Sequence, residues 1–336
     1  MAGVRAKSMK RVTKARAQQR GNALSELIPK DVENAKVQAS GHIVQLTHLK
    51  KLFWPELGIT KGDLLRYYAQ ISPFLLPHLQ DRAMVMKRYP NGAAGDFFFQ
   101  KRAPEPRPDW IEICPIEHRA GMVQFPIVRD LASLLWIVNL GCIDLNPWYG
   151  RCDDINRPDY LHFDLDPVEG TGFSEVLETA LAVHQALDYL EIPSYAKTTG
   201  SRGIHVYVPI ERGPTQKEVW TFAKGLAQEL ASQRPDLITA EYRVARRPAG
   251  HVLVDYNQNA WGRTLASVYS VRPAPRATVS MPVAWDQIKR GIEVEDFHIK
   301  NVPARLKKTG DLWSPLLESR GRFRLENLLN RRTVPG

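Results

Sequence analysis

The sequence predicts a mixed α/β fold in which largely antiparallel sheets are flanked by helices. Two observations support this prediction. Short apolar runs with the character of strands alternate loosely with longer segments that repeat at the helical period. Two pairs of the strand-like runs are joined by short glycine-containing turns, which is typical of hairpins and not of a doubly wound parallel sheet.

The first half of the chain supplies the elements in this order. HIVQLTH at 42–48 predicts a strand, and Thr60 is placed to cap a following helix rich in Leu and Tyr. MVMKRYP at 84–90 and DFFFQKR at 96–102 predict the two strands of a hairpin around the turn NGAAG. Residues 128–140 have the apolar spacing of a buried helix.

The second half continues the alternation. Three segments predict strands, the second of them interrupted by a glycine turn: LHFDLDP at 161–167, AKTTGSRGIHVYVPI at 196–210 and HVLVDY at 251–256. Amphipathic helices are predicted at 174–190 and 215–232, and shorter helical segments at 301–318 and 323–331. The expected organisation is a basic N-terminal tail or extension at 1–41, a catalytic domain at 42–320 and a helical end at 321–336.

The charge of the chain indicates a polyanionic partner. The formal net charge is +10 and the pI is about 9.5. Neutralising phosphates releases their counterions and favours binding to nucleic acid, although a basic pI is equally compatible with simple solubility. Residues 1–18 contain basic residues and no acidic one, a composition that repels itself and rarely packs.

The cysteines and the hydropathy pattern predict a protein of a reducing cytoplasm. Cys114, Cys142 and Cys152 are odd in number and lack paired close spacing, so neither a disulfide framework nor a structural zinc site is predicted. No apolar stretch follows the basic N-terminus, and no run is long enough to span a membrane. A membrane partner is therefore not expected.

Three acidic residues form the strongest candidate for a catalytic site. Asp164 and Asp166 stand two residues apart on a strand, so both project from one face while Phe163 and Leu165 occupy the other. Neighbouring carboxylates repel unless cations lie between them, and hard oxygen ligands suit Mg²⁺ or Mn²⁺. Asp255 ends a later apolar strand that can carry it to the same edge. Alternatives are a calcium site, a sugar-nucleotide site or carboxylates paired with arginines.

The turn before the strand at 204 is a candidate phosphate site. Its backbone N–H groups, the hydroxyls of Thr199 and Ser201 and the charge of Arg202 suit phosphate oxygens, and His205 is placed to donate to them. The alternative is a tight turn with a histidine satisfied in the core.

Consecutive aromatic residues beside cations suggest a surface for stacking nucleic-acid bases. Of Phe97, Phe98 and Phe99, next to Lys101 and Arg102, at least one ring must face away from the core. Phe97 is expected to pack between sheet and helix.

The motifs HFDLDP, SRGIHVYVP and HVLVDYNQN, in this order, resemble the polymerase domain of bacterial DNA ligase D, a branch of the archaeo-eukaryotic primase superfamily. The similarity spans about residues 42–320 and includes KLFWPELGITKGDLLRYYAQISPFLLPHL, MVMKRYPNG, FFFQKRAPEPRPDWI, YSVRPAPRATVSMPVAWDQI and NVPARLKKTGDLWSPLL. The resemblance implies a primase-polymerase fold. It also implies DNA-dependent nucleotidyl transfer that prefers ribonucleotides over deoxyribonucleotides, uses two Mn²⁺ or Mg²⁺ ions, and fills gaps or extends ends in non-homologous end joining.

The resemblance also assigns roles to particular residues. It implies metal ligands at Asp164, Asp166 and Asp255, and triphosphate contacts at Thr199, Ser201, Arg202 and His205. It implies contacts to the incoming base and the template from Phe98 and Phe99 with Lys87 and Arg88, and further nucleotide contacts from Gln258 and Arg272. Lys51 and Lys61, which taken alone resemble ordinary solvated lysines, match two lysines that hold the 5′-phosphate of gapped, nicked or broken DNA.

Two positions depart from the family pattern. The family commonly has lysine where this chain has Arg202, and histidine where it has Asn146 in GCIDLNPWYG. An amide hydrogen-bonds but cannot become cationic or replace an imidazole as a metal ligand. Sugar selectivity or metal preference is therefore expected to differ.

Other functions remain open from the sequence. They are primer synthesis, a two-metal nuclease and a catalytically idle protein that bridges DNA ends, although a pure binder gains nothing from acidic residues facing phosphates. No ligase or nuclease motif follows the polymerase motifs, so a separate ligase and an end-binding protein are the expected partners of a nucleoid-associated monomer.

Overall fold

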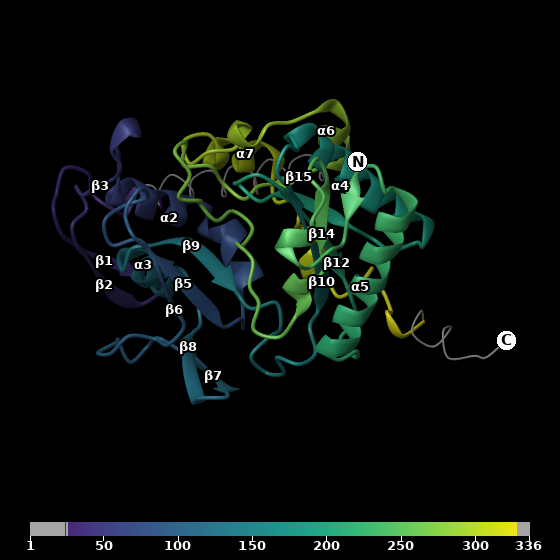
Figure 1. Cartoon of the computed structure of the whole chain (residues 1–336). Helices are drawn as coiled ribbons and strands as arrows, with labels where there is room; N and C mark the ends of the chain where they lie inside the picture. Colours follow the sequence, from purple (N-terminus) through teal and green to yellow (C-terminus); the bar gives the residue numbers. More distant parts are fainter. Residues whose placement is uncertain (1–23, 25, 328–336) are drawn as a thin grey trace, which may run out of the picture.

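Two β-sheets from the two halves of the chain form the framework of the protein (Figure 1). The structure, a computed structural model, describes residue 24 and residues 26–327. The basic segment at 1–18 therefore lies outside the described residues. Within the described part of the chain, no helix is long and apolar enough to cross a membrane.

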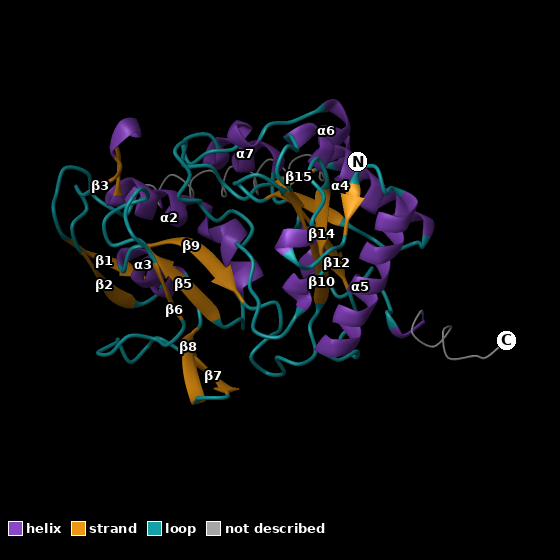
Figure 2. Cartoon of the chain, viewed as in Figure 1, coloured by secondary structure: helices purple, strands orange, loops and turns teal. Residues whose placement is uncertain are grey.

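The larger sheet has six strands in the order β13-β14-β10-β12-β11-β15. Its strands are β10 (Tyr160–Pro167), β11 (Tyr195–Thr198), β12 (Ile204–Pro209), β13 (Ile238–Thr239), β14 (Val252–Asp255) and β15 (Pro282–Val283). All neighbours are antiparallel except β13 and β14. Helices α4 (Phe173–Tyr189) and α5 (Gln216–Gln233) lie along one side of this sheet, which leaves its other face toward the N-terminal half (Figure 2).

The N-terminal half is built around the three-stranded sheet β6-β5-β9. These strands are β5 (Met84–Arg88), β6 (Phe98–Gln100) and β9 (Cys142–Pro147). The other elements are β1 (Ala35–Ala39), β2 (His42–Leu46), β3 (Leu52–Trp54), β4 (Ile59–Thr60), α2 (Lys61–Leu79), β7 (Ile113–His118), β8 (Gly121–Pro126) and α3 (Leu131–Asn139). The antiparallel pairing of β5 with β6 confirms the hairpin predicted around NGAAG.

A capping box fixes the start of α2, as the sequence predicts. The side chain of Thr60 accepts a hydrogen bond from Asp63 N, and the Asp63 carboxylate accepts one from Thr60 N at 2.8 Å. Both bonds satisfy backbone donors that the first helical turn otherwise leaves unpaired. The C-terminal region adds α6 (Trp285–Arg290), α7 (Val302–Thr309) and the 3₁₀ turns η4 (Val294–Asp296) and η5 (Ser314–Leu317).

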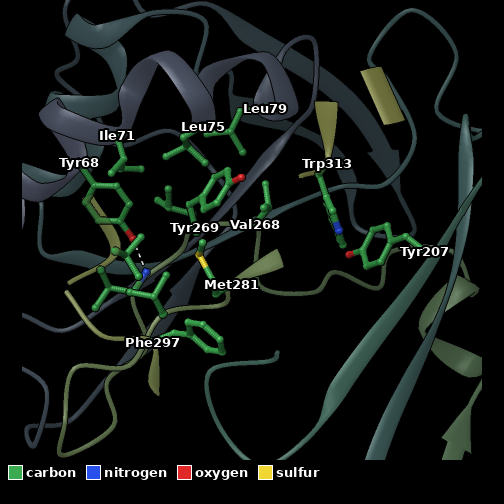
Figure 3. Packing of buried hydrophobic residues seen from close by; sticks show 14 of the residues in the cluster. Tyr68, Ile71, Leu75, Leu79, Tyr207, Val268, Tyr269, Met281, Phe297 and Trp313 are labelled. Atoms are coloured by element: carbon green, nitrogen blue, oxygen red, sulfur yellow. Dashed lines mark hydrogen bonds between the residues drawn. The ribbon is translucent and has the colours of Figure 1, made fainter. Parts of the chain in front are cut away.

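Buried tyrosines join the two halves into one core (Figure 3). Tyr67 Oη donates to Tyr269 O at 2.8 Å, and Tyr68 Oη donates to Ile143 O at 2.7 Å while accepting from Val271 N at 3.0 Å. These bonds satisfy the phenol groups that burial removes from water. The segment after β14 is thereby fixed against α2 and β9.

The packed domain extends beyond the predicted limits of 42 and 320. Strand β1 pairs with β2, and Ile28 is buried in the core. At the other end Phe323 N donates to Pro209 O at 2.9 Å, and Leu325 is fully buried. Apolar side chains on both flanks explain the difference, because they gain free energy by joining the core. Only residues up to 327 of the helical segment expected at 323–331 are described.

One expectation about the cysteines is wrong. Cys114 in β7 and Cys152 form a disulfide with a Cα–Cα distance of 5.8 Å, although they are 38 residues apart. Spacing along the chain did not reveal this disulfide because the two cysteines are brought together by contacts between segments that are distant in sequence. Cys114 pairs with Phe125 across β7 and β8, Ile127 just beyond β8 bridges to Ala83, and Cys152 N donates to Asp81 O at 2.7 Å, so contacts with residues 81–83 bring the two cysteines together.

Candidate active site

The three acidic residues predicted as metal ligands gather at one end of the six-stranded sheet. Asp164 lies directly opposite Asp255 across the antiparallel pair β10–β14, and Asp166 follows two residues later on the same face. Phe163 and Leu165 point to the opposite face and are fully buried. The alternation predicted from HFDLDP therefore places the carboxylates together.

Crowding of the carboxylates raises two of their pKa values. Burial, and then the charge of Asp255, raises the pKa of Asp164 to about 7. The charge of Asp164, and then burial, raises the pKa of Asp166 to about 7. Both shifts mean that negative charge is unfavourable here unless a cation compensates it.

The donor set suits hard divalent cations. All three side chains offer carboxylate oxygens, and Asp164 Oδ1 is buried without a hydrogen bond of good geometry. Asp255 is engaged locally, because Oδ1 accepts from Asn257 N at 2.8 Å and Oδ2 accepts from Gln258 Nε2 at 3.0 Å. Within residues 24 and 26–327 no three His, Cys, Asp or Glu side chains already converge on a single metal position. The carboxylate oxygens are suitable ligands for divalent metal ions. The side chains would have to rotate for all three to reach a single metal ion.

Hydrogen bonds to Thr199, one of the predicted phosphate ligands, stabilise the glycine turn between β11 and β12. Thr199 Oγ1 accepts from Ser201 N and from Gly203 N, both at 3.1 Å. These two backbone donors are therefore not directed at phosphate, contrary to the general expectation for the turn. Arg202 lies near the acids, and its positive charge therefore lowers the pKa of Asp166, which burial and the other carboxylates raise.

His205 lies beside the acids and is held from behind by a buried lysine. His205 Nε2 is 3.0 Å from Asp164 Oδ1, and Lys197 Nζ is 2.6 Å from His205 Nδ1. Burial lowers the pKa of both Lys197 and His205. His205 is thus neither exposed to solvent nor isolated in the core, because its two ring nitrogens contact the Asp164 carboxylate on one side and the Lys197 amino group on the other.

A second group of charges lies beside this site and consists of Lys87 and Asp144 on the three-stranded sheet and Arg272 from the segment after β14. Arg272 Nη1 donates to Thr199 O at 3.1 Å, and Arg272 Nε is 3.5 Å from Asp144 Oδ2. Lys87, directly opposite Asp144 in the β5–β9 pair, has its Nζ 3.9 Å from the same oxygen. The Arg272 side chain lies against Gly200, where an added Cβ would lie 2.6 Å from Arg272 Cγ. One buried carboxylate therefore holds two cations beside the turn.

Asn146 shares this surface of β9. It stands two residues from Asp144, so both side chains project from the same face of the strand. Its amide Nδ2 donates to Asp144 O at 3.0 Å. The residue that departs from the family pattern is buried beside the Lys87–Asp144–Arg272 group.

The three phenylalanines are all exposed and divide between two faces. Phe97, Phe98 and Phe99 expose 51%, 45% and 58% of their surface, so the expected packing of Phe97 between sheet and helix is wrong. Lys87 Nζ lies 4.1 Å from the Phe97 ring centre and 5.6 Å from that of Phe99. Arg88 lies 5.2 Å over the Phe98 ring, because neighbouring residues of β5 and β6 alternate sides.

Arg88 is separated from the nucleotide set and joins Lys51 and Lys61 instead. These three cations line an open pocket of about 370 Å³. Lys51 Nζ donates to Pro90 O at 2.6 Å, Lys61 Nζ to Thr47 O at 2.7 Å, and Arg88 Nε to Leu140 O at 2.7 Å. No acidic side chain is among the described residues that line this pocket. The arrangement is suited to an anion.

Sequence reasoning missed two residues of the site, Asp144 and Lys197. Asp144 lies two residues before Asn146 in the same strand, and Lys197 lies eight residues before His205. The available signal was a charged residue inside an otherwise apolar strand, which is rarely buried without a partner. The partners themselves are distant in sequence, so spacing could not identify them.

Comparisons with known proteins agree with the fold and the motifs. The model of the LigD primase-polymerase domain family matches residues 60–313. The multifunctional non-homologous end joining protein LigD of Mycolicibacterium smegmatis is 32% identical over 275 residues, which cover 81% of this chain and 36% of that protein. The bifunctional LigD of Bacillus subtilis is 30% identical over 268 residues, which cover 80% of this chain and 43% of that protein. The chain thus spans only about two fifths of these relatives.

A solved structure is also similar. The polymerase domain from Mycobacterium tuberculosis Ligase D in complex with DNA superposes with a TM-score of 0.77 at 29% identity, covering 82% of this chain and 98% of that one. The predicted resemblance and the mixed α/β fold are confirmed. This protein belongs to the LigD primase-polymerase domain family.

Proposed function

We propose that this chain, a nucleotidyltransferase by family, adds nucleotides to DNA ends under the direction of a template in non-homologous end joining. Its work would be to fill gaps and extend ends. The main supporting observation is that Asp164, Asp166 and Asp255 gather at one end of the six-stranded sheet, near the cations Lys87 and Arg272. A similar solved domain binds DNA, which supports DNA as the partner of this basic chain.

The acidic group would hold the metal ions and the basic group the triphosphate. The chemistry supplied by Mn²⁺ or Mg²⁺ at this site would be activation of the primer 3′-hydroxyl and neutralisation of the leaving pyrophosphate, with Mn²⁺ an effective activator by family resemblance. Asp164, Asp166 and Asp255 supply the carboxylates. Arg272 and Lys87 would carry positive charge to the phosphates, and His205 and Arg202 would contact the same group from the other sheet.

The phenylalanines would contact bases from two directions. Phe99 shares a face with Lys87, which supports stacking on the incoming base. Phe98 faces the side of Arg88 and the 370 Å³ pocket, which supports a contact to the template near the downstream strand. In the pocket itself, Lys51, Lys61 and Arg88 would hold the 5′-phosphate of a gap or break.

An extension assay tests this proposal. The substrates are primed DNA with a gap, the same DNA without a 5′-phosphate, and unprimed template, each with rNTPs or dNTPs and Mn²⁺ or Mg²⁺. We expect extension of primed DNA, faster with a 5′-phosphate, with rNTPs and with Mn²⁺. Products only from unprimed template would instead identify a primase, and DNA binding without any product would identify an idle bridging protein.

Replacing Asn146 with the family histidine should change metal dependence more than sugar choice. The amide still hydrogen-bonds a 2′-hydroxyl, so wild type should prefer ribonucleotides, whereas imidazole can contact a metal that the harder amide oxygen holds less well. The measurement is the ratio of rNTP to dNTP incorporation in Mn²⁺ and in Mg²⁺ for wild type and Asn146→His. A collapsed sugar ratio with a fixed metal ratio would show that this role is assigned wrongly.

The preference for a 5′-phosphate should weaken as pH rises above about 8. Burial, and then the charge of Lys51, lowers the pKa of Lys61 to about 8. The phosphate binds the protonated amine, so affinity should be constant below this pKa and fall by up to about tenfold per pH unit above it. The measurement is the ratio of affinities for phosphorylated and unphosphorylated gapped DNA between about pH 6.5 and about pH 9.5, a range that spans this pKa.

Lys61→Arg provides the matched control, because guanidinium stays charged throughout this range. Its affinity ratio should not vary with pH. A wild-type ratio that stays flat or rises with pH would contradict a phosphate contact through Lys61.

A further inference from the structure

We propose that Asp144 is a positioning residue that holds Lys87 and Arg272 in the places from which they bind the triphosphate of the incoming nucleotide. Asp144 itself does not touch the nucleotide. The consequence for binding rests on the proposed function, in which both cations contact the triphosphate. The fixed places of the two side chains do not depend on that function.

Asp144 is a buried charge whose ion-pair partners are these two cations. It exposes 1% of its surface, and its Oδ2 lies 3.5 Å from Arg272 Nε and 3.9 Å from Lys87 Nζ. Neither Asp144 Oδ1 nor Arg272 Nε makes a hydrogen bond, so the group is joined by charge. Removing a carboxylate from water is unfavourable unless cations compensate it. The two cations therefore account for the burial of Asp144.

Each cation is also held on a second side. Lys87 Nζ lies 4.1 Å from the centre of the Phe97 ring, and Arg272 Nη1 donates to Thr199 O at 3.1 Å. Lys87 belongs to β5 of the three-stranded sheet, whereas Thr199 follows β11 of the six-stranded sheet. Asp144 on β9 thus joins a cation of one sheet to a cation bound to the glycine turn of the other. The distance between the two positive charges therefore depends on Asp144.

Charge alone would make Asp144 unfavourable for nucleotide binding, because a carboxylate repels phosphate. Without Asp144, however, the two cations would repel each other. Burial lowers the pKa of Lys87, the charge of Asp144 raises it, and the charge of Arg272 lowers it again. Loss of the Asp144 charge should thus tighten nucleotide binding if charge alone matters, and weaken it if Asp144 positions the cations.

Steady-state kinetics of Asp144→Asn test this sign. The amide keeps the shape of the side chain and removes its charge. We expect the KM for the nucleotide to rise about tenfold with a smaller change in kcat, because misplaced cations make weaker charge-assisted contacts with the triphosphate. Asp188→Asn removes the same charge from an exposed position on α4 and should keep the wild-type KM. An unchanged or lower KM in Asp144→Asn would overturn the proposal.

A background without the two cations tests whether Asp144 acts through them. With Lys87→Met and Arg272→Met already present, Asp144→Asn should not raise the KM further. An equal rise in this background and in the wild type would refute action through Lys87 and Arg272.

NMR of the arginine side chains tests the positioning itself, and its wild-type arm does not require a folded Asp144 variant. The ¹⁵Nε–¹Hε signal of Arg272 is identified as the one missing from Arg272→Lys. On the picosecond-to-nanosecond timescale we expect this group to move as little as the backbone, and much less than that of the exposed Arg320. Its motion should increase in folded Asp144→Asn. Motion in the wild type as large as that of Arg320, or motion unchanged by Asp144→Asn, would contradict the proposal.

The proposed function can fail independently. A chain that adds no nucleotide to any primed DNA would refute that function but leave the NMR result intact. A chain that adds nucleotides normally while the Arg272 side chain is as mobile as that of Arg320 would refute only the role of Asp144.

Discussion

Replacing Asp164 and Asp166 together by alanine is expected to lower the rate of nucleotide addition by about 10³-fold or more. The two side chains supply two of the three carboxylates gathered at the end of β10, and their loss leaves Asp255 as the one member of that group. DNA binding should persist at near wild-type affinity, because the carboxylates face metal ions and contribute no attraction to phosphates. The measurements are extension of a gapped primer and binding of the same DNA by fluorescence anisotropy.

The control is a double variant that carries both Asp188→Ala and Asp286→Ala, which changes the net charge as much as the replacement of Asp164 and Asp166 does. Both residues are exposed on helices α4 and α6, away from the sheet end that carries the acids. This variant should extend DNA like the wild type. Extension at the wild-type rate by a folded Asp164→Ala and Asp166→Ala protein would contradict the assignment of these residues to metal binding.

Replacing Lys51 and Lys61 should abolish the preference for a phosphorylated gap. Each charge-assisted contact contributes about 1.5–3 kcal/mol, so losing both should lower the relative affinity by at least about 100-fold. Lys61 is buried along its stem, and Lys61→Met therefore preserves its packing better than alanine does. The measurement compares the double variant that carries both Lys51→Met and Lys61→Met with the wild type. The substrates are gapped DNA with and without the phosphate, and a simple primed template.

Extension of the simple primed template should be unaffected, because the pocket lies on the opposite face of β5 from Lys87. Lys50→Met is the matched control, since Lys50 is exposed next to Lys51 and does not line the pocket. An equal loss on all substrates would show that these lysines serve general DNA affinity and not a dedicated 5′-phosphate site.

Short-range patterns predicted much of the framework. The HFDLDP alternation placed Asp164 and Asp166 on one face, Thr60 marked the start of α2, and NGAAG marked a hairpin. Each of these features depends on residues only a few positions apart, where strand and helix periodicity fix the geometry. The pairing of Asp164 with Asp255 followed because both lie on apolar strands of one sheet.

The features that sequence reasoning missed depend on contacts between distant segments. Lys197 contacts Ser280 across 83 residues, and Cys114 pairs with Cys152 across 38 residues. The family resemblance grouped Arg88 with Lys87, yet neighbours on a strand face opposite ways, and Arg88 lines the same pocket as Lys51. A local sequence pattern predicts on which face of a strand or helix a side chain lies. It does not predict which residue from a distant segment that side chain contacts.

The most direct test is incorporation of single nucleotides into a phosphorylated one-nucleotide gap, with each templating base in turn, each rNTP supplied alone, and Mn²⁺ present. A template-directed nucleotidyltransferase should add only the nucleotide complementary to the templating base, and the variant lacking Asp164 and Asp166 should add none. Addition that ignores the templating base, or no addition by wild type on any of these substrates, would contradict the proposed function.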